Sequence, residues 1–159
     1  MSLTGFSRMG GLLCAAWLAG CAMDPPLPWM TVLELAQARE KAIAENRRVL
    51  MLFTGSDWCP PCQLLQRRVL QTPEFRRYAQ SNLVLVEVDF PRRKVLAPEL
   101  SATNHALARN YQVEVFPTLV LLDREGKELR KAQGYLGGGW ERHLAWIEPR
   151  PEPPVSLSP

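Results

Sequence analysis

The sequence carries no strong excess of charge of either sign: 19 Lys and Arg stand against 16 Asp and Glu, and the net charge is +3. It lacks the basic stripe that nucleic-acid binders use, so we expect no nucleic-acid partner. It also lacks an apolar run of the roughly 20 residues that a membrane-spanning helix needs, because the N-terminal run covers only residues 9–19. No internal repeat is present.

The composition is that of a chain with one packed core. Hydrophobic residues make up 47% of it and charged residues 22%, which is typical of a globular domain. The 14 prolines gather near both ends, and such stretches are typical of extended tethers. We therefore expect a Pro-rich tether over 21–30, a folded domain over 31–148 and a disordered tail over 149–159.

The N-terminus has the order of a secretory signal: one charge, Arg8, then the apolar run, then small residues. The segment Leu18-Ala19-Gly20-Cys21 resembles the lipobox of bacterial lipoproteins. This resemblance implies a signal peptide over 1–20, a lipid on Cys21 and anchoring on the periplasmic side of the cell envelope, in the inner or the outer membrane. The alternative is an ordinary cleaved signal in which Cys21 has no role.

Two cysteines remain for the folded domain, Cys59 and Cys62, because Cys14 leaves with the signal and Cys21 takes the lipid. Three roles compete for this pair: a redox couple, half of a metal site, and a structural disulfide. Export places the pair in a compartment where disulfides persist. A loop of two residues closes almost no chain entropy, however, so a purely structural bridge gains little stability there.

Hydrophobic periodicity and end signals predict alternating helices and strands. Thr31 and Glu34 form a capping-box pattern. Leu33, Ala36 and Ile43 follow at helical spacing. The whole pattern predicts a helix to about 45, a strand over 48–54, a helix from 60 that restarts at 72, a strand over 83–90, a helix over 99–110, strands over 118–122 and 128–133, and a last helix from 140 to 147.

Strands separated by helices predict parallel pairs joined by crossovers, and the final hairpin predicts an antiparallel edge. The expected fold class is therefore α/β, with a central mixed sheet and helices on both faces. Within it, Trp58-Cys59-Pro60-Pro61-Cys62 follows the first strand, and Val115-Phe116-Pro117-Thr118 leads into a later one. These motifs and the element order resemble the thioredoxin family over about residues 31–148.

The resemblance implies a thioredoxin-like fold and a thiol–disulfide oxidoreductase, with no cofactor beyond a redox-active disulfide between Cys59 and Cys62. The partners that it implies are client proteins with disulfides or thiols and a membrane or soluble electron donor. It also implies a cis peptide between Phe116 and Pro117 beside the sulfurs, which leaves the Phe116 backbone free to pair with an extended substrate. The alternative is a trans proline that starts a strand.

Physical chemistry gives the two cysteines different roles. The strand delivers Cys59 to a helix N-terminus, where free N–H groups and the helix dipole favour a thiolate, so Cys59 is the expected nucleophile. Cys62 lies on the same side of the first turn and is placed to resolve a mixed disulfide. Pro60 and Pro61 stiffen the turn that substrate meets. Trp58 is expected to cover the edge of the site, unless it is an ordinary core tryptophan.

One position departs from the family pattern. Many members carry a buried Asp in the strand before the two cysteines, and that Asp handles the proton of the resolving thiol. Here Leu52 takes the matching position. Glu87 and Asp89 on the next strand are possible substitutes; the alternative is that both face solvent.

Other functions remain to be weighed. His105 and His143 could join the two cysteines around zinc or copper, although neither shows paired-ligand spacing. A non-catalytic binding module of this fold would usually lose a cysteine. Among redox roles, the WCxPC pattern and the absence of a large inserted helical domain favour a reductase over an oxidase or isomerase. The basic loop over 91–94 is either a run of solvated charges or a docking site for an acidic partner.

Overall fold

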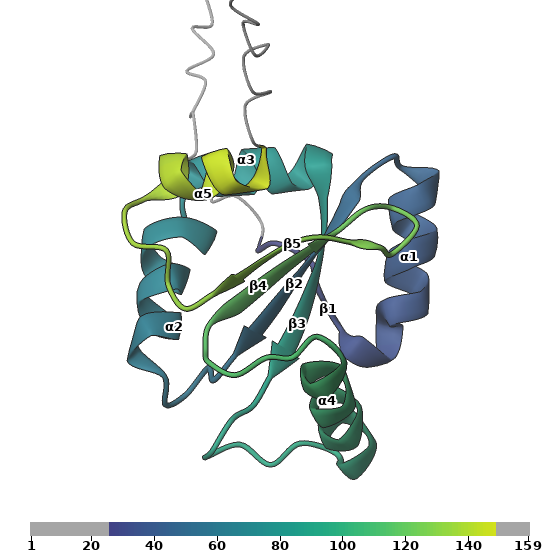
Figure 1. The fold of residues 1–159 in the computed structure, drawn as a ribbon, viewed down its shortest axis with the longest axis vertical. Helices are drawn as coiled ribbons and strands as arrows, with labels where there is room; N and C mark the ends of the chain where they lie inside the picture. The colour runs from purple at the N-terminus through teal and green to yellow at the C-terminus, as the bar shows by residue number, and fades with distance from the viewer. Residues whose placement is uncertain (1–25, 149–159) are drawn as a thin grey trace, which may run out of the picture.

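The computed structural model describes residues 26–148 (Figure 1). The expected signal peptide, the lipidation candidate Cys21 and the Pro-rich tail lie outside these residues. The strands are β1 (Trp29–Thr31), β2 (Arg48–Thr54), β3 (Leu83–Asp89), β4 (Thr118–Leu122) and β5 (Glu128–Gln133). The helices are α1 (Leu35–Ala44), α2 (Pro60–Leu65), α3 (Pro73–Asn82), α4 (Pro98–Asn110) and α5 (Trp140–Ile147), with a 3₁₀ turn η1 (Val32–Glu34) before α1 and a π-helical turn η2 (Gln66–Leu70) after α2.

The strands form one mixed sheet in the order β1-β3-β2-β4-β5. β3 pairs in parallel with both β1 and β2, whereas β4 runs antiparallel to β2 and β5. Figure 1 shows α1 and α4 on one side of the sheet and α2, α3 and α5 on the other. The predicted fold class, a central mixed sheet with helices on both faces, is confirmed.

A hydrophobic core lies on each face of the sheet. Leu50 and Leu52 of β2 face the core shared with α2, η2, α3 and α5, while Met51 and Phe53 face the core shared with α1. Alternate side chains of a strand point to opposite faces. Because both faces are covered, β2 is apolar at nearly every position, as buried strands of parallel pairs are.

The structure differs from the sequence prediction in the face that α1 buries. Thr31 N–H donates to Glu34 Oε2 at 2.7 Å, as the capping-box pattern predicts. The periodic residues Leu33 and Ile43, however, are 50% and 59% exposed. Ala38 and Ala42 are buried in their place, because their small side chains let the helix lie close to the sheet.

The sheet also begins earlier along the chain than the expected domain boundary. β1 includes Trp29 and Met30, which the sequence analysis places in the tether, and it pairs with β3 from Trp29 opposite Leu85. Leu27 and Trp29 pack against the buried core. The apolar residues between the N-terminal prolines therefore complete the edge of the sheet.

A polar cluster joins the elements at the pole where β2 begins. One guanidinium nitrogen of Arg48 donates to the Tyr78 hydroxyl at 2.7 Å and to a Glu148 carboxylate oxygen at 2.9 Å. The other terminal nitrogen donates to the Ile147 carbonyl at 3.0 Å. The cluster ties β2, α3 and the end of α5 together. Between residues 26 and 148, none of the helices is long and apolar enough to cross a membrane.

Candidate active site

The two cysteines of the folded domain lie where β2 gives way to α2. Cys59 is the residue at the helix N-cap, and a disulfide joins it to Cys62 with the Cα atoms 5.3 Å apart. The Cys62 backbone N–H also points to the Cys59 Sγ, 3.3 Å away. Cys59 is 3% and Cys62 5% exposed, whereas Pro60 and Pro61 between them are exposed. An N–H aimed at sulfur at a helix N-terminus favours the thiolate form of that sulfur.

Trp58 lies against the cysteine turn and against the loop before β4. Its Nε1–H donates to the Phe90 carbonyl at 2.7 Å, and its ring meets the Phe116 ring edge-on, with centroids 6.0 Å apart. A Cβ at position 55 would lie 2.5 Å from Trp58 Cε2, so Gly55 is needed for this close approach. Trp58 is half-buried at the rim of the site rather than within the core.

The segment before β4 reaches the cysteines through the sheet. Thr118, the first residue of β4, pairs with Phe53 near the end of β2. Phe116 and Pro117 therefore lie beside the turn that carries Cys59. The peptide bond between them is cis. Pro117 is buried, and its carbonyl accepts from Gly134 N–H at 2.7 Å.

Two consecutive residues before Trp58 bind the end of β3 and the loop that follows it. The Ser56 N–H and hydroxyl donate to the Asp89 carboxylate at 2.9 and 2.6 Å. The Asp57 carboxylate accepts from the backbone N–H groups of Arg92, Arg93 and Lys94 at 2.9, 2.7 and 3.3 Å. The hydrogen bond from Arg92, with help from the next two, holds the pKa of the Asp57 carboxyl below its ordinary value.

Ser56 and Asp57 contribute to the site although the sequence did not predict it. The available signal was a hydroxyl and a carboxylate directly before Trp58, at a turn where such side chains bind backbone N–H groups. Their partners lie more than 30 positions away, at separations of 33 to 37 residues. Only the parallel pairing of β2 with β3 brings these partners alongside.

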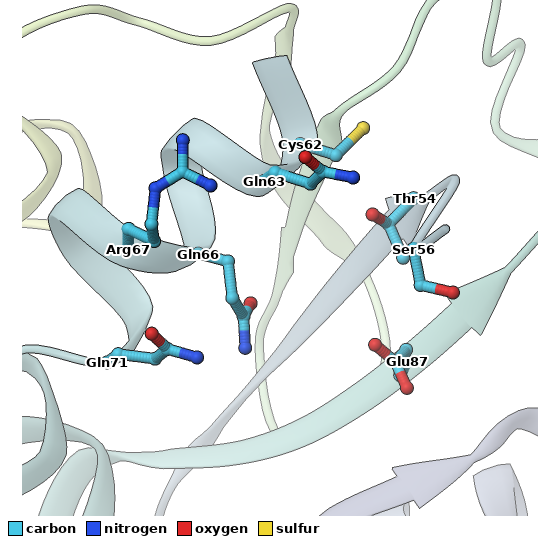
Figure 2. A pocket seen from close by; sticks show the side chains of 8 residues that line it. All are labelled: Thr54, Ser56, Cys62, Gln63, Gln66, Arg67, Gln71 and Glu87. Atoms are coloured by element: carbon cyan, nitrogen blue, oxygen red, sulfur yellow. The ribbon is translucent and has the colours of Figure 1, made fainter. Parts of the chain in front are cut away.

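A cavity of about 280 Å³ lies beneath Cys62. Its lining includes Thr54, Gln66 and Glu87. Figure 2 shows Cys62 on α2 and Glu87 on β3 at opposite sides of this cavity, with the Thr54 and Ser56 side chains between them in the view. Burial, followed by the charge of Asp89, raises the pKa of the Glu87 carboxyl, while Lys94 opposes that rise.

The two possible acids of β3 thus have different surroundings. Asp89 is engaged by Ser56. Glu87 has no hydrogen-bond or ion-pair partner within the described residues and lines the Cys62 cavity. Leu52, at the position where many family members carry the acid, is buried and lies opposite Glu87 in the sheet.

The two histidines do not join the cysteines. The His105 ring packs edge-on against Phe90, with centroids 5.2 Å apart. His143 is buried in α5, stacks on Tyr135 and has Nδ1 2.9 Å from the Gly139 carbonyl oxygen. Over residues 26–148, no three His, Cys, Asp or Glu side chains gather in a way that could hold a metal ion.

Comparison with known proteins agrees with this geometry. Residues 35–146 match the family described as the thioredoxin-like domain. The disulfide bond reductase DsbH of Chlamydia pneumoniae is 39% identical over 104 residues, which cover 65% of this chain and 63% of DsbH. The thioredoxin-related protein DsbJ of the same organism is 30% identical over 97 residues, which cover 61% of this chain and 28% of DsbJ. The chain therefore spans less than two thirds of the length of either relative.

A solved structure of a DsbH oxidoreductase has the same fold. It superposes with a TM-score of 0.69 at 31% identity and covers 91% of this chain and 92% of its own. Together with the disulfide at the N-terminus of α2, these matches show that the chain belongs to the thioredoxin-like family of thiol–disulfide oxidoreductases.

Proposed function

We propose that this oxidoreductase works in the cell envelope as a reductase of disulfides in client proteins. The observation that carries the proposal is the Cys59–Cys62 disulfide at a helix N-terminus, with the Cys62 N–H aimed at the Cys59 sulfur. The direction is supported by the likeness to a relative that is named a disulfide bond reductase. The envelope location is supported by the signal-like N-terminus and its Cys21.

The reaction runs as two exchanges of sulfur partners. In the reduced protein, the Cys59 thiolate attacks one sulfur of the client disulfide; a bond from Cys59 to the client forms, and the client's second sulfur leaves as a thiolate. The Cys62 thiolate then attacks the Cys59 sulfur, which closes the Cys59–Cys62 disulfide and releases the first client sulfur. The client gains two electrons, and the protein is left oxidised until a dithiol donor returns two electrons to it.

We assign to Glu87 the role of accepting the proton that the Cys62 thiol loses. Cys62 must lose its proton before it can attack, and Glu87 lines the same cavity. Its carboxyl is unpaired and has a raised pKa, which makes the carboxylate a stronger base than that of an ordinary glutamate. Transfer through water and the Thr54 hydroxyl suits the arrangement in Figure 2.

Insulin reduction with dithiothreitol tests the activity. We expect the wild-type protein to accelerate it and Cys59→Ser to abolish the acceleration. Once dithiothreitol has been removed, reduced Cys62→Ser should accumulate a one-to-one mixed disulfide with the substrate. Cys21→Ser is the matched control, because it makes the same chemical change outside the site and should leave the rate in solution unaltered. Equal rates for wild type and Cys59→Ser would refute the catalytic role.

The proposed anchor has a separate test. Mass spectrometry of the mature N-terminus should find a chain that begins at Cys21 and carries acyl groups, and Cys21→Ser should move the protein out of the membrane fraction. A chain that begins unmodified at Met1, or one cut after Cys21, would refute the lipid anchor and leave the redox function standing.

A further inference from the structure

Three consecutive exposed cations stand beside the active site. Arg92, Arg93 and Lys94, here called the basic rim, are exposed, and none forms an ion pair within residues 26–148. The residue that follows them, Val95, is 93% exposed. A charge run that serves only solubility needs no fixed shape, so the conformation of the rim decides between the two interpretations.

The rim is fixed to the turn that carries the nucleophile. The Asp57 carboxylate binds the backbone N–H groups of all three rim residues. The Arg92 guanidinium lies over the Trp58 ring, 3.8 Å from its centroid. Because these contacts order the loop before any partner arrives, a partner that binds it loses less conformational entropy. A solvated charge run gains nothing from such ordering.

The rim also borders a cavity of about 290 Å³ that reaches Trp58. Phe90, Lys94, Asn104 and His105 help to line it. Asn104 is buried; its Nδ2 donates to the Asp89 carbonyl at 2.7 Å, and its Oδ1 has no hydrogen-bond partner within the described residues. This cavity therefore offers positive charge and aromatic surface beside the rim.

The Phe116 ring links the rim to the proposed path of the substrate. It stacks on Phe90, with centroids 5.0 Å apart, and touches Trp58. A polypeptide that runs past Phe116 with its cysteine at Cys59 thus has its neighbouring residues close to the rim.

We propose that the basic rim binds an acidic, extended segment of the redox partner next to the cysteine that exchanges with Cys59. This inference rests on the proposed function and names the partner chemistry of the same site. The charges of the rim attract the acidic segment as the two proteins approach. They also fix which part of the partner's chain lies next to the Cys59 sulfur, as charges around an interface do.

Two peptide disulfides of equal length test the proposal: one has Glu residues beside its cysteine, and the other has Gln in their place. We expect the reduced full chain to react about tenfold faster with the acidic peptide at low salt. The ratio should fall toward one at 1 M salt, where charges are screened beyond about 3 Å. Anisotropy of labelled peptides with Ser in place of Cys should show the same preference in binding.

The variant pair Arg93→Glu and Lys94→Glu, made together, should abolish the preference. It should leave unaltered the rate of the first exchange with neutral bis(2-hydroxyethyl) disulfide, because Glu87, whose pKa depends on Lys94, takes no part in that exchange. Lys41→Glu with Lys127→Glu is the control, since it makes the same change in charge on exposed residues away from the active site. Equal loss in the control pair, equal rates for both peptides in wild type, or binding to phosphatidylglycerol vesicles without peptide preference would each overturn the proposal. Preferential binding without any turnover would support the rim and refute the reductase function.

Discussion

Replacing Glu87 by Gln is expected to slow the closure of the Cys59–Cys62 disulfide about tenfold near neutral pH. A positioned side chain that moves a proton typically contributes roughly 10²–10⁴-fold. Glu87 shares a cavity of about 280 Å³ with Cys62, and a cavity of that size has room for several waters at about 30 Å³ each. Water therefore competes for the same proton, which places the expected effect below the lower end of that range.

Single-turnover mixing of reduced protein with a fluorescent peptide disulfide resolves the two exchanges, and the second phase reports the closure. Burial raises the pKa of Glu87, so the wild-type second phase should rise as pH passes through that raised value. Glu87→Gln should lose this step and keep only the rise due to the Cys62 thiol, near pH 8.5 for an ordinary cysteine. Glu128→Gln, an exposed acid on β5, is the control. An identical second phase and pH profile in Glu87→Gln would refute the assignment.

Glu87→Gln should also change the free energy of unfolding, in a direction fixed by the linkage between proton binding and folding. A carboxyl whose pKa is raised by folding contributes stability below its unfolded pKa, and that contribution is lost as pH rises through the folded value. Glu87→Gln removes the cost of burying the charge, so its unfolding free energy should gain on that of wild type as pH rises above the ordinary carboxyl value of 4.5. A slower second phase joined to higher stability would separate a catalytic role from a structural one.

Three further predictions concern the scaffold. Phe75→Ala should lower the unfolding free energy in urea by about 3–5 kcal/mol, because Phe75 is 1% exposed; a loss below about 1 kcal/mol would contradict its place in the core. Burial lowers the pKa of His143. The unfolding free energy should therefore be highest above the pKa of His in the unfolded chain, about 6.5, and decrease as pH falls below it. In melting experiments at several pH values, His143→Gln should reduce this decrease. Asp57→Ala should speed hydrogen exchange at the backbone amides of the basic rim, while exchange within β4 stays unchanged. Equal exchange in the variant and the wild type would contradict the hydrogen bonds from these amides to the Asp57 carboxylate.

The sequence predicted elements best where a single residue pattern decides the structure. β2 was placed at its observed bounds because burial on both faces leaves an unbroken apolar run. The cysteine motif was placed correctly because Pro60 marks the first turn of α2. The pattern failed for α1, where Leu33 and Ile43 are exposed, because a helix that packs through alanines has no bulky stripe to reveal its buried face.

The parts of the site that could not be predicted depend on contacts between distant segments. Which of Glu87 and Asp89 is free to face the cavity beside Cys62 depends on the position of Ser56, because Ser56 forms hydrogen bonds with the Asp89 carboxylate. The hydrogen bonds to the Asp57 carboxylate depend on the path of a loop whose backbone N–H groups, rather than its side chains, are the donors. Backbone donors leave no trace in a sequence, so such contacts become visible only in three dimensions.

The Arg48 cluster gives the molecule an orientation. It holds the end of α5 at the pole where β2 starts, and β1 begins at that same end of the sheet, whereas Cys59 follows the opposite end of β2. Five residues from Cys21 to the first described residue span at most about 18 Å when fully extended. With Cys21 acylated as proposed, the protein would stand on the bilayer by its non-catalytic pole. Its dithiol would then face outward and reach soluble proteins more readily than groups at the lipid surface.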